Sequence, residues 1–249
     1  MKRILLAISL LFSFTVPALA AHIIGGEMRY TYVGPGASAN SKIYRITLIL
    51  FRGDDPTGAA LAPSYVVGVY NNDNGAKIIG TAINNNWLVT QDIPPGIQAV
   101  PIVLPTCIQG APNLNYTYAS YSMTIELPVN NNGYTAAYQT CCRINGMVNV
   151  GNSTGSTYNC IIPGTNQLPA GDDSSPRFLA PVNVICRNAP FTLNFSATDP
   201  DATDSLAYSL CNALNGGASV NAGFDDPAGP PYGSVGYTNP YSAANPFGT

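Results

Sequence analysis

Alternation of apolar and polar residues is the dominant pattern along this chain. It is strongest from Ile43 to Phe51 and recurs from Tyr65 to Tyr70 and from Asn115 to Leu127. Successive strand side chains point to opposite faces, so a period of two predicts strands with one buried face. Further strands are predicted at His22–Val33, Lys77–Ile83, Trp87–Thr90, Ala99–Leu104, Tyr134–Ile144, Met147–Val150, Val182–Cys186, Phe191–Ala197 and Ser205–Cys211. After residue 20 no stretch shows the 3.6-residue period of an amphipathic helix, and the pattern predicts an all-β protein.

Turn residues divide the strands at the spacing of a β-sandwich. Asn145-Gly146 is typical of a type I′ turn and predicts a hairpin between Tyr134–Ile144 and Met147–Val150. Asn71 to Gly75 predicts a second hairpin.

The strands fall into two groups, separated by a segment rich in Pro, Gly, Asp and Ser that runs from residue 162 to residue 181. We place a domain boundary at Ser174, giving residues 21–174 and 175–249. Both are expected to be immunoglobulin-like or β-sandwich domains. The second is expected to be incomplete, because three strands cannot close a sandwich.

The first 20 residues have the pattern of a secretory signal peptide. Lys2-Arg3 precede an apolar run, and Ala18-Leu19-Ala20 ends it with the small residues of a cleavage site. The apolar run is short for a membrane span, and no later segment has the length of apolar sequence that a spanning helix needs. The chain is therefore expected to be secreted or held at the cell surface, without a transmembrane span after cleavage.

Charge is scarce in this sequence and argues against two classes of partner. Charged residues make up 9% of the chain, and without Lys2 and Arg3 eight basic and 13 acidic residues leave a net charge of −5. No cluster of basic residues is present, which argues against nucleic acid and anionic membrane surfaces as partners. The expected partner is an extracellular polymer or surface ligand.

Six cysteines in an exported chain favour disulfides over metal thiolates, and no C-x-x-C pair is present. Cys141 and Cys142 are adjacent in a predicted strand, so their thiols should point in opposite directions and pair with different partners. Cys186 and Cys211 bracket two predicted strands and are expected to pair with each other. Cys107 and Cys160 would then pair with Cys141 and Cys142, in an order that remains open. Six cysteines allow fifteen connectivities, so this pairing is a preference.

Asp199, Asp201 and Asp204 lie in one loop between two predicted strands. Calcium takes about six to eight oxygen ligands in flexible geometry, and alternate carboxylates in a loop can point at one centre. The alternative is that Asp-Pro-Asp and Thr-Asp-Ser simply form turns. The three aspartates are therefore a candidate calcium site, and no other cofactor is expected.

Several segments resemble the amino-terminal region of large Bacteroidetes surface proteins. They are AHIIGGEMRYTYV (21–33), YRITLILFRGD (44–54), GYTAAYQTCCR (133–143), SPRF (175–178) and ICRNAPFTLNFSATDPDATDSLAYSLC (185–211). In that family, PKD, immunoglobulin-like or cadherin-like repeats follow, and a gliding-motility-associated, type IX secretion domain ends the chain. The resemblance implies a role in gliding or adhesion, and cadherin-like modules similar to residues 185–211 bind calcium through such acidic loops.

Few residues suggest catalysis. His22 is the only histidine, which excludes a triad built in the body of the domain. Glu27 and Glu126 are the only glutamates, and nothing in their spacing selects them as a glycosidase pair. We therefore expect no enzymatic activity and a structural or adhesive role.

A carbohydrate-binding module is the alternative. It would use an aromatic platform, which is weighed against ordinary packing of aromatic residues within the sheet. The candidate platform residues are Trp87, Tyr116, Tyr118, Tyr121, Tyr134 and Tyr138.

Overall fold

The structure is a computed structural model, and the part of the chain that it describes is almost entirely strand and loop. The described residues are 23–53, 60–102, 104–110, 114–144, 146–151, 154–168, 171–178, 184, 186, 189–190, 192, 194–202, 204–217 and 226–248. The predicted signal peptide, His22 and Asn145 lie outside them. Within these residues the prediction of an all-β protein is confirmed, and one short 3₁₀ helix (Ile83–Asn85) interrupts the strands.

The described residues form ten strands. They are β1 (Ile23–Pro35), β2 (Ser41–Arg52), β3 (Ser64–Asn71), β4 (Trp87–Gln91), β5 (Gln98–Ala99), β6 (Thr117–Pro128), β7 (Tyr134–Thr140), β8 (Ser156–Ile162), β9 (Arg177–Phe178) and β10 (Ala197–Thr198). The longest, β1, β2 and β6, are the segments with the clearest alternation, because one face of each is buried.

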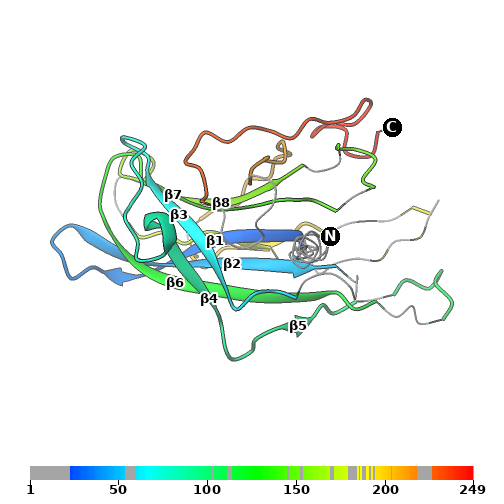
Figure 1. The fold of residues 1–249 in the computed structure, drawn as a ribbon, viewed down its shortest axis with the longest axis horizontal. Helices are drawn as coiled ribbons and strands as arrows, with labels where there is room; N and C mark the ends of the chain where they lie inside the picture. Colours follow the sequence, from blue (N-terminus) through cyan, green and yellow to red (C-terminus); the bar gives the residue numbers. More distant parts are fainter. Residues whose placement is uncertain are drawn as a thin grey trace, which may run out of the picture.

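The strands pair antiparallel in the order β1-β2-β6-β4-β3-β7-β8, with β5 added beside β6. Strand β3 connects two layers, because Ser64–Val67 pairs with β4 whereas Gly68–Asn71 pairs with β7. The sheet folds over at this strand, so that β7 and β8 lie across β1, β2 and β6 (Figure 1). The result is a sandwich-like arrangement in which the two end strands, β1 and β8, lie near each other.

The core lies between the two layers. One layer contributes Ile46, Leu48 and Leu50 of β2, which are fully buried. Tyr65 of β3 makes edge-to-face contacts with Tyr121 at 4.8 Å and with Tyr138 at 5.3 Å. These three tyrosines come from β3, β6 and β7, so aromatic packing helps to hold the layers together.

Both predicted hairpins differ from the structure. Strand β7 ends at Thr140 and pairs with β8, not with Met147–Val150, because β8 provides a full seven-residue edge. Gly146 has a positive φ of 83° and lies in the long β7–β8 connection. The turn at Asn71–Gly75 forms, with the Gly75 N–H donating to the Asn71 carbonyl at 2.8 Å. It is followed by one isolated bridge from Tyr70 to Lys77 and not by a strand over Lys77–Ile83.

Segments beyond Ser174 cover the two end strands of the sandwich. The Ser175 N–H donates to the Tyr30 carbonyl of β1 at 3.0 Å, and the Thr157 N–H of β8 donates to the Leu214 carbonyl at 3.2 Å. In the described part of residues 175–249, the strands are the two-residue β9 and β10. The division into domains at Ser174 stays a prediction.

Candidate functional site

An acidic cluster is formed by Asp173, Asp201 and Asp204. One carboxylate oxygen from each lies within 4.8 Å of the others. Two of the three predicted calcium ligands are therefore together. The third, Asp199, uses its Oδ1 to accept the Asp201 N–H at 2.9 Å. Asp173 was missed because it lies in the predicted linker, and only the tertiary contact with strand β1 brings it to the loop.

Hydrogen bonds fix this cluster against β1. The Tyr30 hydroxyl donates to the Asp173 carboxylate, and the Ser174 N–H donates to Asp201 Oδ2 at 2.7 Å. Burial raises the pKa of Asp173, and the nearby charges of Asp201, Asp204 and Asp199 raise it further, although the Tyr30 hydrogen bond opposes them. Burial also raises the pKa of Tyr30, so its hydroxyl remains a donor at neutral pH. Burial and the neighbouring carboxylates therefore destabilise the ionised form of Asp173.

The three carboxylates are the kind of ligand that a hard cation prefers, but they are too few to fill its coordination shell. Carboxylate oxygens are the ligands that calcium prefers, yet three carboxylates provide fewer than the roughly six to eight oxygens it takes. Backbone carbonyls or water would have to complete the shell. Calcium binding by Asp199, Asp201 and Asp204 stays a prediction, and the structure adds Asp173 beside Asp201 and Asp204.

If calcium binds here, it should stabilise the folded chain. Extracellular sites have dissociation constants of roughly 10⁻⁴ to 10⁻³ M, so a tenfold excess over that value would add about 1.4 kcal/mol to the free energy of unfolding. Thermal unfolding with calcium and with a chelator measures this. Asp204→Asn should remove the effect, whereas Asp172→Asn should keep it, because Asp172 pairs with Lys42 at 3.1 Å outside the cluster. Equal midpoints with calcium and chelator would contradict the site.

The two glutamates lie far apart. Glu27 of β1 is opposite Ile49 of β2, which pairs with Ser120, whereas Glu126 is six positions further along β6. At about 3.4 Å per residue this separates the two by roughly 20 Å, beyond the separation of a glycosidase pair.

The two carboxyl groups also differ in their surroundings. Burial raises the pKa of Glu27, although Arg29 beside it at 3.3 Å opposes the rise. Hydrogen bonds from the Ser41 hydroxyl and the Ser38 N–H lower the pKa of Glu126 to about 2. Each carboxyl group therefore has local partners of its own.

Most residues of the candidate aromatic platform are buried in the core or partly buried against it. Tyr121, Tyr134 and Tyr138 are buried, and the indole N–H of Trp87 donates to the Ile78 carbonyl at 3.1 Å. Tyr118 remains half-buried on the outer face of the sheet. There it stacks on Phe51 with ring centroids 5.7 Å apart. A smaller outer pair thus replaces the predicted platform, because alternate residues of β6 face opposite sides.

The cysteine pairing differs from the prediction. Cys107 is bonded to Cys186, and Cys141 to Cys142, while Cys160 is a buried free thiol and Cys211 an exposed one. The predicted Cys186–Cys211 pair is therefore wrong, and so is the pairing of Cys141 and Cys142 with Cys107 and Cys160. Strand β7 ends at Thr140, so the strict alternation that would point the two adjacent thiols apart does not extend to them.

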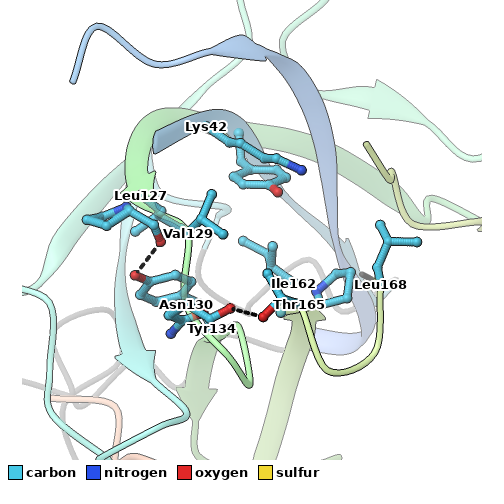
Figure 2. Close-up of a pocket in the computed structure, with 12 residues that line it drawn as sticks. Lys42, Leu127, Val129, Asn130, Tyr134, Ile162, Thr165 and Leu168 are labelled. Atoms are coloured by element: carbon cyan, nitrogen blue, oxygen red, sulfur yellow. Dashed lines mark hydrogen bonds between the residues drawn. The ribbon is translucent and has the colours of Figure 1, made fainter. Parts of the chain in front are cut away.

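A small cavity lies at one end of the sandwich, where β2, β6, β7 and β8 meet. Figure 2 shows Lys42, Tyr134, Ile162 and Leu168 around it. Its volume is about 30 Å³, and the Tyr134 hydroxyl donates to the Pro128 carbonyl at 2.7 Å on its wall. That volume accommodates water but not a sugar ring.

Comparison with known proteins found no match among family models, curated proteins or solved structures. None of the helices in the described ranges has the length and apolar character needed to cross a bilayer.

Proposed function

We propose that this chain is a non-catalytic segment of a secreted or cell-surface protein, with a structural or adhesive role in gliding or attachment. The observation that carries the proposal is the cross-linked β framework. The Cys107–Cys186 bond joins residues 79 positions apart, which suits a protein exported to an oxidising compartment. The signal-peptide pattern and the resemblance to Bacteroidetes surface proteins support the same role.

The surface chemistry also supports this proposal. Polar groups come mainly from amides and hydroxyls, and ion pairs among the described residues are few. One is Arg45 with Asp92 at 3.0 Å, in which Asp92 also accepts the hydroxyls of Ser120 and Ser122. These hydrogen bonds outweigh the burial of Asp92 and lower its pKa, so the carboxylate stays ionised. A network that satisfies itself in this way is suited to a scaffold rather than to a reacting centre.

Deleting the gene in the bacterium that encodes this chain tests the proposal. We expect attachment to a solid surface or gliding to fall, growth in suspension to be unchanged, and the full gene to restore the loss. Fractionation should find the protein outside the cell, without residues 1–20. A cytoplasmic location, or hydrolytic activity of the purified chain, would overturn the proposal.

A carbohydrate-binding module remains the second candidate, and the stacked Phe51–Tyr118 pair favours it. The rings lie on the same sheet face as Ser120 and Ser122, whose hydroxyl groups donate to Asp92 but can still accept hydrogen bonds, so apolar and polar groups occur together as in sugar sites. Glycan arrays with the purified chain test this candidate. Tyr118→Ala should abolish binding, and Tyr208→Ala is the control, because Tyr208 is exposed and lies outside the large sheet. Binding that survives Tyr118→Ala would exclude this surface.

A further inference from the structure

A cleft of about 300 Å³ separates β1 from β8, the two end strands of the folded sheet. We call it the edge cleft. Its walls include Met28 of β1, Cys160 and Ile161 of β8, and Pro176 and Phe178 from the segment that follows Ser175. It is about ten times the volume of the cavity in Figure 2. Both walls are strand edges, so each has backbone N–H and C=O groups on the side away from its paired strand.

The β1 wall is only partly paired. The Tyr30 N–H donates to Ser175 Oγ at 2.9 Å, and the Tyr32 N–H to Ser174 Oγ at 3.1 Å, both on the side away from β2. Alternate residues of a strand direct their backbone groups to the same side, so the N–H and C=O of Met28 also point away from β2. Two residues after Ser175, Arg177 would face Met28 in such pairing, but it pairs with Thr198 instead. Pairing along β1 therefore stops at the cleft.

The covering segment then turns to a different partner. Arg177 and Phe178 form β9 and pair with β10, with Phe178 opposite Ala197. The chain that covers Tyr30 thus leaves β1 before it reaches Met28. No hydrogen bond within the described residues occupies the outward groups of Met28.

The β8 wall is also only partly paired. Residues beyond Cys211 cover its first half, with the Thr157 N–H donating to Leu214 and the Gly155 N–H to Asn215 Oδ1 at 3.0 Å. By the same alternation, the backbone groups of Asn159 and Ile161 point away from β7. Among the described residues nothing pairs with them. Two successive outward positions of β8 therefore have no backbone partner within the part of the chain that the structure describes.

The chemistry of the cleft favours an uncharged occupant. Glu27 and Arg29 at its border neutralise each other at 3.3 Å. Ile161 and Phe178, on opposite walls of the cleft, are exposed to 60% and 57% and offer apolar surface beside the unpaired backbone groups. An extended peptide supplies backbone donors and acceptors at the spacing of a strand edge, together with apolar side chains for the cleft.

The length of the free edge favours a short segment over a second copy of this chain. Pro176 and Phe178 line the cleft, and Leu214 and Asn215 cover the start of β8. They leave about four or five residues of β8 accessible, roughly 15 Å of edge. A second copy pairing through its whole seven-residue β8 would collide with these flanks.

We propose that the edge cleft binds a short, extended, uncharged peptide segment of a partner protein. The segment adds as a strand to Asn159 and Ile161 of β8, and its apolar side chains enter the cleft. Peptide capture here does not depend on the adhesive role proposed above.

Amide hydrogen exchange of the purified chain, followed by NMR, tests this proposal. Without peptide, the N–H groups of Asn159 and Ile161 should exchange faster than that of Thr157, which is paired. A short acetylated and amidated peptide of alternating valine and threonine should slow exchange at Asn159 and Ile161 about tenfold. The same peptide N-methylated at alternate residues should give no protection, because it lacks the donors that pair with β8.

Substitutions locate the effect. Ile161→Arg places a charge at the cleft and should abolish protection. Val148→Arg is the matched control, because Val148 is also an exposed β-branched residue, at 71%, and does not line the cleft. Near-native circular dichroism of both variants would show that the fold is intact. No protection by the unmodified peptide, or protection that survives Ile161→Arg, would overturn the proposal. Protection that appears without peptide and grows with protein concentration would assign the edge to self-association instead.

Discussion

Loss of the Cys107–Cys186 disulfide is expected to lower the free energy of unfolding by about 4.5 kcal/mol. The bond closes a loop between residues 79 positions apart, and the entropy that such a loop removes from the unfolded chain grows with its length. A double substitution, Cys107→Ser with Cys186→Ser, should show this as a lower midpoint in urea unfolding. That is a large share of the 5–15 kcal/mol that stabilises a typical domain.

The matched control is Cys211→Ser, because Cys211 is an exposed free thiol and its loss should leave the midpoint unchanged. Proteolysis without reduction, followed by mass spectrometry, should recover Cys107 and Cys186 in one cross-linked product. A product that joins Cys186 to Cys211 would contradict the structure and restore the pairing expected from sequence.

Leu48→Ala is expected to destabilise the chain by about 2 to 5 kcal/mol. Leu48 is fully buried at the centre of β2, where both neighbouring strands are paired along its length. Removing its side chain loses the free energy of burial and leaves a cavity that a close-packed sandwich cannot collapse. Urea unfolding monitored by tyrosine fluorescence measures the change.

Leu88→Ala makes the same chemical change at a position that is 42% exposed on β4. It should alter the free energy of unfolding by much less than Leu48→Ala. Similar losses at both positions would mean that the inner and outer faces of the sheet have been assigned incorrectly.

The same inner and outer assignment bears on function. The tyrosines that sequence reasoning grouped as a platform are divided by the sheet: Tyr121 and Tyr138 pack inward on Tyr65, and Tyr118 stays outside with Phe51. Surfaces for recognition therefore remain at the outer Phe51–Tyr118 pair and at the edge cleft. The two are on different parts of the molecule, and the variants Tyr118→Ala and Ile161→Arg separate their contributions.

The sequence by itself determined the class of fold and the positions of β1, β2, β3, β6 and β7. It did not predict β8, and the strand predicted at Ser205–Cys211 does not form. Apolar and polar residues alternate wherever one face of a strand is buried. The strands at Ile43–Phe51 and Asn115–Leu127 could therefore be recognised before their neighbouring strands were known. Local turn chemistry was a weaker guide. Asn145-Gly146 can form a tight turn, yet pairing of β7 with the seven-residue edge of β8 stabilises more backbone than pairing with Met147–Val150.

Only the tertiary structure decided which distant residues meet. Asp173 joins Asp201 and Asp204 because the segment around Ser174 pairs with β1, and no local pattern encodes that contact. The disulfide partners likewise follow from where loops end in space, so spacing along the chain could not select Cys107 for Cys186. Likewise, the edge cleft exists only because the sheet folds at β3 and brings β8 beside β1, a consequence of burying both apolar faces in one core.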